Sequence, residues 1–72
     1  MSKLPVISGK HLIKILCKYF NFRPLRQKGS HVTLTNDFVF ITVPMHNELD
    51  KGTLLGILKD ADISKEDFIK NL

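Results

Sequence analysis

His31 is the residue of this sequence best placed to do chemistry, because of the residues that precede it. It closes the run RQKGSH, in which the cations Arg26 and Lys28 come before a Gly-Ser pair. An imidazole whose unperturbed pKa is about 6.5 can both accept and donate a proton near neutral pH. A cation beside it favours the neutral form that a general base requires. Lys28, Arg26 or the backbone N–H groups of the Gly29 turn would stabilise negative charge that develops on a substrate.

Other arrangements of reactive side chains carry less weight. Ser30 adjoins His31, but neighbouring strand residues point to opposite faces of a sheet, so this histidine cannot readily activate that serine. His31, His46 and Cys17 do not match any zinc-ligand spacing, and we predict neither a metal nor another cofactor. Cys17 lies in an apolar helical pattern, which is typical of a buried structural thiol. A single cysteine also fits a reducing cytoplasm, where we expect the protein to act.

Charge is unevenly distributed along the chain. Residues 1–36 hold seven cations and no acid, whereas residues 37–72 hold seven acids and four cations, so a net charge of +4 divides into +7 and −3. Such asymmetry predicts a basic surface suited to a polyanion such as nucleic acid, and the alternative is a solvated basic face without a partner. RNA fits a histidine base, because its 2′-hydroxyl lies next to a phosphate that it can attack once deprotonated. No apolar run approaches the roughly 20 residues that span a bilayer, so no membrane segment is predicted.

A helix is predicted at the start of the chain. Ser8 is a good N-cap, and the apolar periodicity continues to about Phe20. Asn21 tolerates the left-handed conformation that ends a helix. His11 lies on the polar side and is most simply a solvent-exposed residue. Three lysines form a stripe at i, i+4 and i+8 opposite the apolar side: Lys10, Lys14 and Lys18.

Three strands are predicted to follow, with the sequences FRPLRQ, HVTLT and FVFITV. Pro24 places the first strand at a sheet edge, where a missing N–H does least harm. If Asn36 and Asp37 form a two-residue hairpin loop, antiparallel pairing joins two apolar pairs on one face. Those pairs are Leu34 with Val39, and Val32 with Ile41.

The first hairpin decides what lies beside the histidine. If Lys28 and Gly29 form its two-residue loop, Leu25 pairs with Val32 on the inner face and Arg26 pairs with His31 on the outer face. A bulge in either hairpin would exchange the faces. The residues that we expect to share the outer face are Arg26, His31, Thr33, Phe40 and Thr42.

Two helices are predicted to complete the domain. Asp50 is the expected N-cap of the first, whose core face is Leu54, Ile57, Leu58 and Ala61. The second opens at Ser64, where Asp67 approximates a capping box and Ile63 can contact Phe68. Residues 1–72 are therefore predicted to form a single α+β domain in the order helix, three strands, two helices.

Four segments in this order and spacing resemble the HicA family of bacterial and archaeal toxins: LPVISGKHLIKIL, RQKGSHV, VPMH and KGTLLGILKDADIS. The resemblance covers nearly the whole chain, and its most specific element is R-x-x-G-S-H, followed by V-P-x-H and G-T-L-x-x-I-L. It implies a fold similar to the double-stranded RNA-binding domain, with helices on one face of a three-stranded antiparallel sheet. It also implies an endoribonuclease that cleaves mRNA without metal through one histidine, and a HicB antitoxin that binds and blocks the site.

The resemblance assigns residues by position. The catalytic histidine falls on His31, and His46 matches the histidine of V-P-x-H, either as a helper or substrate contact or as a structural cap of its loop. Asn21 and Asp62 stand where the family commonly has glycine, and the hairpin at 36–37 is shorter than in many members. The predicted substrate-binding set is Lys10, Lys14, Arg26, Lys28, Gly29, Ser30 and His46.

These observations predict a toxin that cleaves mRNA and forms a hetero-complex with a HicB-like antitoxin; the sequence does not set the oligomeric state of the free protein. One alternative is a non-catalytic RNA-binding module that uses the same surface. Another is an interaction domain whose exposed Phe38 and Phe40 dock a protein partner.

Overall fold

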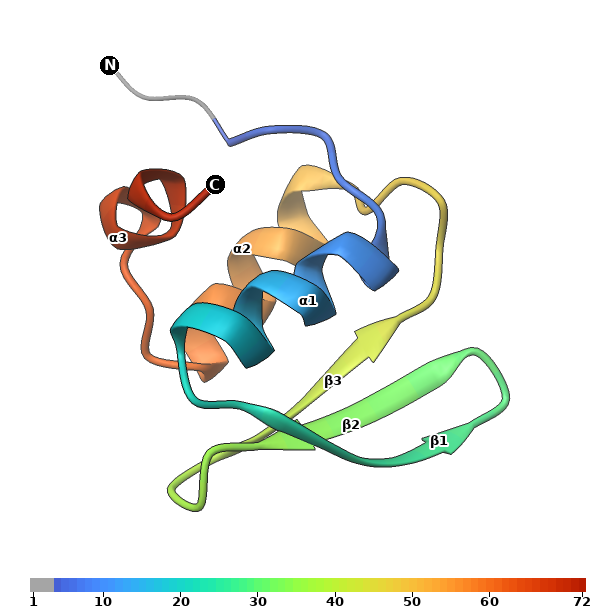
Figure 1. The fold of residues 1–72 in the computed structure, drawn as a ribbon. Coiled ribbons are helices and arrows are strands. Elements are labelled where there is room, and N and C mark those ends of the chain that lie inside the picture. Colours follow the sequence, from blue (N-terminus) through green and yellow to red (C-terminus); the bar gives the residue numbers. More distant parts are fainter. Residues whose placement is uncertain (1–3) are drawn as a thin grey trace.

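The computed structural model describes residues 4–72. Its elements are α1 (Gly9–Tyr19), β1 (Arg23–Lys28), β2 (His31–Thr35), β3 (Phe40–Pro44), α2 (Lys51–Asp60) and α3 (Lys65–Lys70). The strands form an antiparallel sheet in the order β1-β2-β3, and the helices lie on one side of it (Figure 1). The predicted α+β class and element order are confirmed. None of the helices in the described part is long and apolar enough to cross a membrane.

The core lies between the helices and the inner face of the sheet. Leu12 and Leu16 of α1 are fully buried together with Leu34 of β2. Phe68 of α3 is also fully buried, and Ile63 packs against the same cluster. The predicted core face of α2 is confirmed, since the buried residues of this segment are Leu54, Ile57, Leu58 and Ala61.

The helix termini also follow the predicted signals. The Ser8 hydroxyl accepts a hydrogen bond from the His11 N–H at 3.0 Å, which satisfies a donor in the first turn of α1. Asp50 and Ser64 cap α2 and α3 in the same way. Asn21 and Asp62 adopt positive φ values of 62° and 59°. Glycine is the residue that reaches this conformation without steric cost, and asparagine and aspartate are among the few others that tolerate it.

Cys17 is partly buried and forms no disulfide. Its burial raises the pKa of the thiol, because removal from water disfavours the thiolate. The thiol was predicted to be buried and is partly so.

The hairpin between β2 and β3 differs from the prediction by two residues. Leu34 pairs with Ile41, not with Val39. Val32 pairs with Val43, not with Ile41. The loop therefore has four residues instead of two, and the predicted pairings were wrong. Because the side-chain period of a strand is two, a shift of two residues leaves every side chain on its predicted face.

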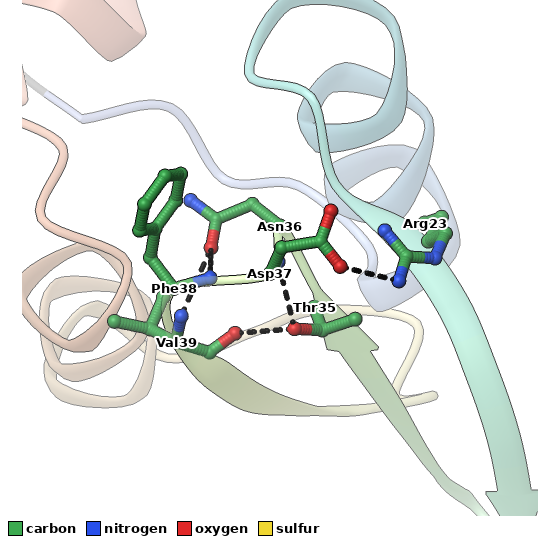
Figure 2. A network of polar contacts seen from close by, with 6 residues as sticks. All are labelled: Arg23, Thr35, Asn36, Asp37, Phe38 and Val39. Atoms are coloured by element: carbon green, nitrogen blue, oxygen red, sulfur yellow. Dashed lines mark hydrogen bonds and ion pairs between the residues drawn. The ribbon is translucent and has the colours of Figure 1, made fainter.

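Side chains within the turn explain its length (Figure 2). The side-chain Oδ1 of Asn36 accepts hydrogen bonds from the N–H groups of Phe38 and Val39, both at 3.0 Å. The buried Thr35 hydroxyl donates to the Val39 carbonyl at 2.8 Å and accepts from the Asp37 N–H at 3.1 Å. In a two-residue loop, these backbone groups would instead form hydrogen bonds between the strands. Because the side chains of Thr35 and Asn36 satisfy them, the four-residue loop is favoured.

An ion pair joins this turn to β1. The Asp37 carboxylate lies 2.6 Å from the Arg23 guanidinium, and both side chains are largely exposed. The hydrogen bond from Arg23 lowers the pKa of Asp37, and the charge of the guanidinium adds to the effect. Asp37 also has a positive φ of 78°, which asparagine tolerates as well as aspartate does.

Replacement of Asp37 by Asn should therefore make the protein less stable near neutral pH. Because the pKa of Asp37 is lower in the folded state, the ion pair stabilises the protein fully at pH values above the unfolded pKa of about 4. This stabilisation is lost as the pH falls through the pKa of the folded state. The difference in the urea midpoint between wild type and D37N should accordingly vanish in acid. Asp60→Asn, which makes the same change in net charge outside an ion pair, is the control. A difference between wild type and D37N that persists unchanged at acid pH would contradict the assignment.

Candidate functional site

His31 is the first residue of β2 and follows a two-residue turn of Gly29 and Ser30. Gly29 has a positive φ of 59° at the first turn position, which is the place of glycine in a type II′ hairpin turn. Lys28 and His31 form the pair that closes the hairpin, and both side chains are exposed. Residues in such a pair have Cβ atoms about 5 Å apart, so Lys28 is the cation beside the imidazole.

The predicted pairing of Arg26 with His31 was wrong. Arg26 pairs with Thr33, because the turn lies one residue further along the chain than predicted. Arg26 still lies on the same face as His31, at the diagonal position. The predicted outer-face set is thus retained, while Leu25 falls at a bulge and is 48% exposed instead of packing on Val32.

Backbone hydrogen bonds bring the loop that carries His46 to the same end of the sheet. The Met45 N–H donates to the Ser30 carbonyl at 2.6 Å, which extends the ladder past the pair of His31 with Pro44. The Gly9 N–H donates to the His46 carbonyl at 3.0 Å. The V-P-x-H loop is therefore held between the G-S-H turn and the first residue of α1.

Gly9 allows this contact because it has no side chain. A Cβ built on Gly9 would overlap the Pro44 carbonyl oxygen and would lie 3.2 Å from the Met45 Cα. The atoms opposed to it are backbone, so they cannot move aside as a flexible side chain can. The close approach also places the exposed Lys10, the next residue of α1, beside the His46 loop.

In the described part of the chain, the lysine and arginine side chains at this end of the sheet form no ion pair. The one ion pair among residues 4–72 joins Arg23 and Asp37 at the opposite end of β2. The pKa of Asp50 is lowered mainly by the hydrogen bond from the Thr53 N–H, and the charge of His46 is the smallest of its causes. The exposed cations Arg26 and Lys28 are thus available to an external anion.

Most of the predicted site residues gather here, but one does not. The G-S-H hairpin and the His46 loop meet directly, and Lys10 adjoins them through Gly9. Lys14 instead lines a separate hollow formed by α1 and the end of the chain, Asn71 and Leu72. No group of three or more His, Cys, Asp or Glu side chains in the described part of the chain is arranged to hold a metal ion.

The described residues thus define a small basic α+β protein with an exposed histidine among cations that form no ion pair. The family comparison identifies the class further. Residues 9–63 match the family model described as the HicA toxin of bacterial toxin-antitoxin systems, so the chain belongs to the HicA toxin family. The match spans the G-S-H turn, the V-P-x-H loop and α2. A search of curated proteins and a search of solved structures each returned no match.

Two features of this region escaped the sequence analysis. The contact of Gly9 with Pro44 joins residues far apart in the chain, and only the glycine in ISGKH hinted at it. The position of Lys28 opposite His31 depended on which two residues form the turn. The Gly-Ser dipeptide fits a turn with glycine at its first position, and this was the signal that could have set the register.

Gly9→Ala should lower the free energy of unfolding by about 2 kcal/mol or more, because the new methyl group forces the Pro44 backbone away. The measurement is urea unfolding followed by circular dichroism. Gly56→Ala is the matched control: Gly56 lies in α2 with no atom within 4 Å of an added Cβ, so alanine should stabilise the protein by up to about 1 kcal/mol. Equal effects of the two substitutions would show that the contact at Gly9 is not tight.

Proposed function

We propose that this toxin is a metal-independent endoribonuclease that cleaves mRNA, with His31 as its catalytic general acid or base. The observation that carries the proposal is the exposed imidazole at the start of β2, directly opposite Lys28 and next to a tight turn. The geometry leaves the ring open to a polymer from solvent. Cleavage of mRNA would inhibit translation and growth, which accords with membership of a toxin family.

The proposed chemistry uses the substrate as its own nucleophile. His31 removes the proton of a ribose 2′-hydroxyl, and the resulting oxyanion attacks the adjacent phosphorus while the bond to the 5′-oxygen breaks. The products are a 2′,3′-cyclic phosphate and a 5′-hydroxyl, whose proton comes from a general acid. His46, carried by the loop tied to Ser30, is the proposed helper for this proton or for a substrate contact.

Positive charge at the hairpin would stabilise the phosphorane-like transition state. Lys28 and Arg26 lie on the same face as His31, and the Gly29–Ser30 turn presents backbone N–H groups beside it. Lys10 would hold a neighbouring phosphate, because it adjoins the His46 loop. Lys14 lies farther away, in the hollow at Asn71, and would contact the strand outside the cleaved bond.

We further propose that a HicB-like antitoxin covers this face, since a toxin of a toxin-antitoxin system has a neutralising partner. Residues 1–72 are proposed to act as one toxin domain, a view supported by the one hydrophobic cluster that joins all three helices and strands β2 and β3. The proposed substrate is mRNA, which places the activity in the cytoplasm.

His31→Ala should reduce the rate of RNA cleavage by about 10²–10⁴-fold, the usual contribution of a general acid or base. The measurement is the cleavage of a labelled single-stranded RNA in EDTA, together with growth arrest after induced expression. The fold should be intact because the side chain is exposed.

Lys59→Ala, which changes an exposed side chain in the last turn of α2, should keep wild-type activity. If H31A cleaves RNA as fast as wild type, the catalytic assignment is wrong. If the wild-type protein shifts RNA on a gel without shortening it, the protein is an RNA-binding module and the nuclease proposal fails.

A further inference from the structure

The hollow that contains Lys14 lies on α1, outside the His31 cluster. It has a volume of about 260 Å³, and its walls come from α1 on one side and from Asn71 and Leu72 at the end of the chain on the other. Figure 1 shows this end of the chain directly after α3. Small-molecule pockets usually measure about 300–1,000 Å³, so this hollow is large enough for one unit of a polymer but small for a free ligand.

Its lining combines cations with an aromatic ring. Lys14 and Lys18 supply positive charge, and neither forms an ion pair within the described residues. The Lys18 Nζ lies 5.3 Å from the centroid of the Tyr19 ring, and this tyrosine is 48% exposed. Ile15 contributes an apolar floor from the same helix.

The amide of Asn71 provides a polar group in the lining of the same hollow. Its Nδ2 donates to the Asp67 carbonyl at 2.9 Å, which fixes the orientation of the side chain. This bond uses one of the two N–H groups, so the other N–H and the amide oxygen remain for a ligand. An aromatic face, an oriented amide and nearby cations together match a nucleobase and its phosphate.

The position of the hollow relates it to the proposed cleavage site. Lys10, Lys14 and Lys18 follow one another on the exposed side of α1, and eight residues of helix span about 12 Å. The first of these lysines adjoins the His46 loop, and the last lines the hollow. A strand bound at His31 therefore has a cationic path along the helix to Tyr19.

We propose that this hollow is a nucleotide subsite, in which an unpaired base of the substrate stacks on Tyr19 while its phosphates contact Lys14 and Lys18. The inference rests on the proposed function for the identity of the polymer. It assigns the substrate class, because a base can enter the hollow only when it is not stacked in a duplex. The protein therefore selects single-stranded RNA over duplex RNA.

Tyr19 itself reports on the subsite, because the chain has one tyrosine and no tryptophan. In the inactive His31→Ala variant, a single strand of about twelve nucleotides should quench the tyrosine fluorescence as the base stacks, while a duplex of equal length should not. In this background Tyr19→Ala should weaken binding of the single strand about tenfold, a loss within the range of one base-aromatic stack. Tyr19→Phe, which keeps the ring, should bind as the parent does when measured by fluorescence anisotropy of labelled RNA.

The cleavage assay separates this inference from the proposed function. With His31 present, kcat/KM is measured for the single strand of about twelve nucleotides and for a dinucleotide. Tyr19→Ala should lower the ratio of the first value to the second about tenfold, mainly through the KM of the longer strand. Circular dichroism checks that the variant is folded. If the strand binds without quenching and Tyr19→Ala binds it as tightly as the parent does, the subsite is refuted and the hollow is left for another partner, such as an acidic peptide. Failure of the wild-type protein to cleave either substrate refutes the nuclease proposal instead, and the fluorescence result still decides the subsite.

Discussion

The contact between the first turn of α1 and the end of β3 determines the shape of the candidate site. Gly9 approaches the Pro44 backbone so closely that no side chain fits, and its N–H binds the His46 carbonyl. The Met45 N–H binds the Ser30 carbonyl on the other side of the loop. Three segments far apart in sequence are thus joined by hydrogen bonds between backbone groups. Their side chains, including His31 and His46, remain free to face solvent.

Ion pairing and turn chemistry are concentrated at the opposite end of the sheet. There Arg23, Thr35 and Asp37 satisfy one another and define a four-residue loop. At the end with His31, the cations have no partner within the described chain. Polar groups that are satisfied internally stabilise a fold, whereas unpaired charges of one sign attract a ligand of the other sign. The cations without an ion pair therefore gather at the His31 end of β2, whereas the pairing of Arg23 with Asp37 lies at its other end.

Local signals predicted the helices well and the strand register less well. Ser8, Asp50 and Ser64 cap helices as their sequence contexts indicated. Strand faces were also correct except at Leu25, which lies at the bulge of β1, because both hairpins deviate by two residues and the side-chain period is two. The pairings themselves were wrong, since a hairpin register depends on which residues turn. That choice was decided by the side chains of Thr35 and Asn36 in one loop and by the conformation of Gly29 in the other.

The sequence alone determined the element order, the apolar faces and the excess of cations in the first half. It also determined that His31 follows a Gly-Ser pair preceded by cations. Each of these depends on residue type and on spacing along a helix or strand. Tertiary structure decided which cation stands opposite the imidazole, how the His46 loop reaches Ser30, and that Lys14 lines a hollow with Asn71. These are contacts between distant segments. They depend on register and on close backbone approach, which a local glycine can indicate but which only the packing of distant segments fixes.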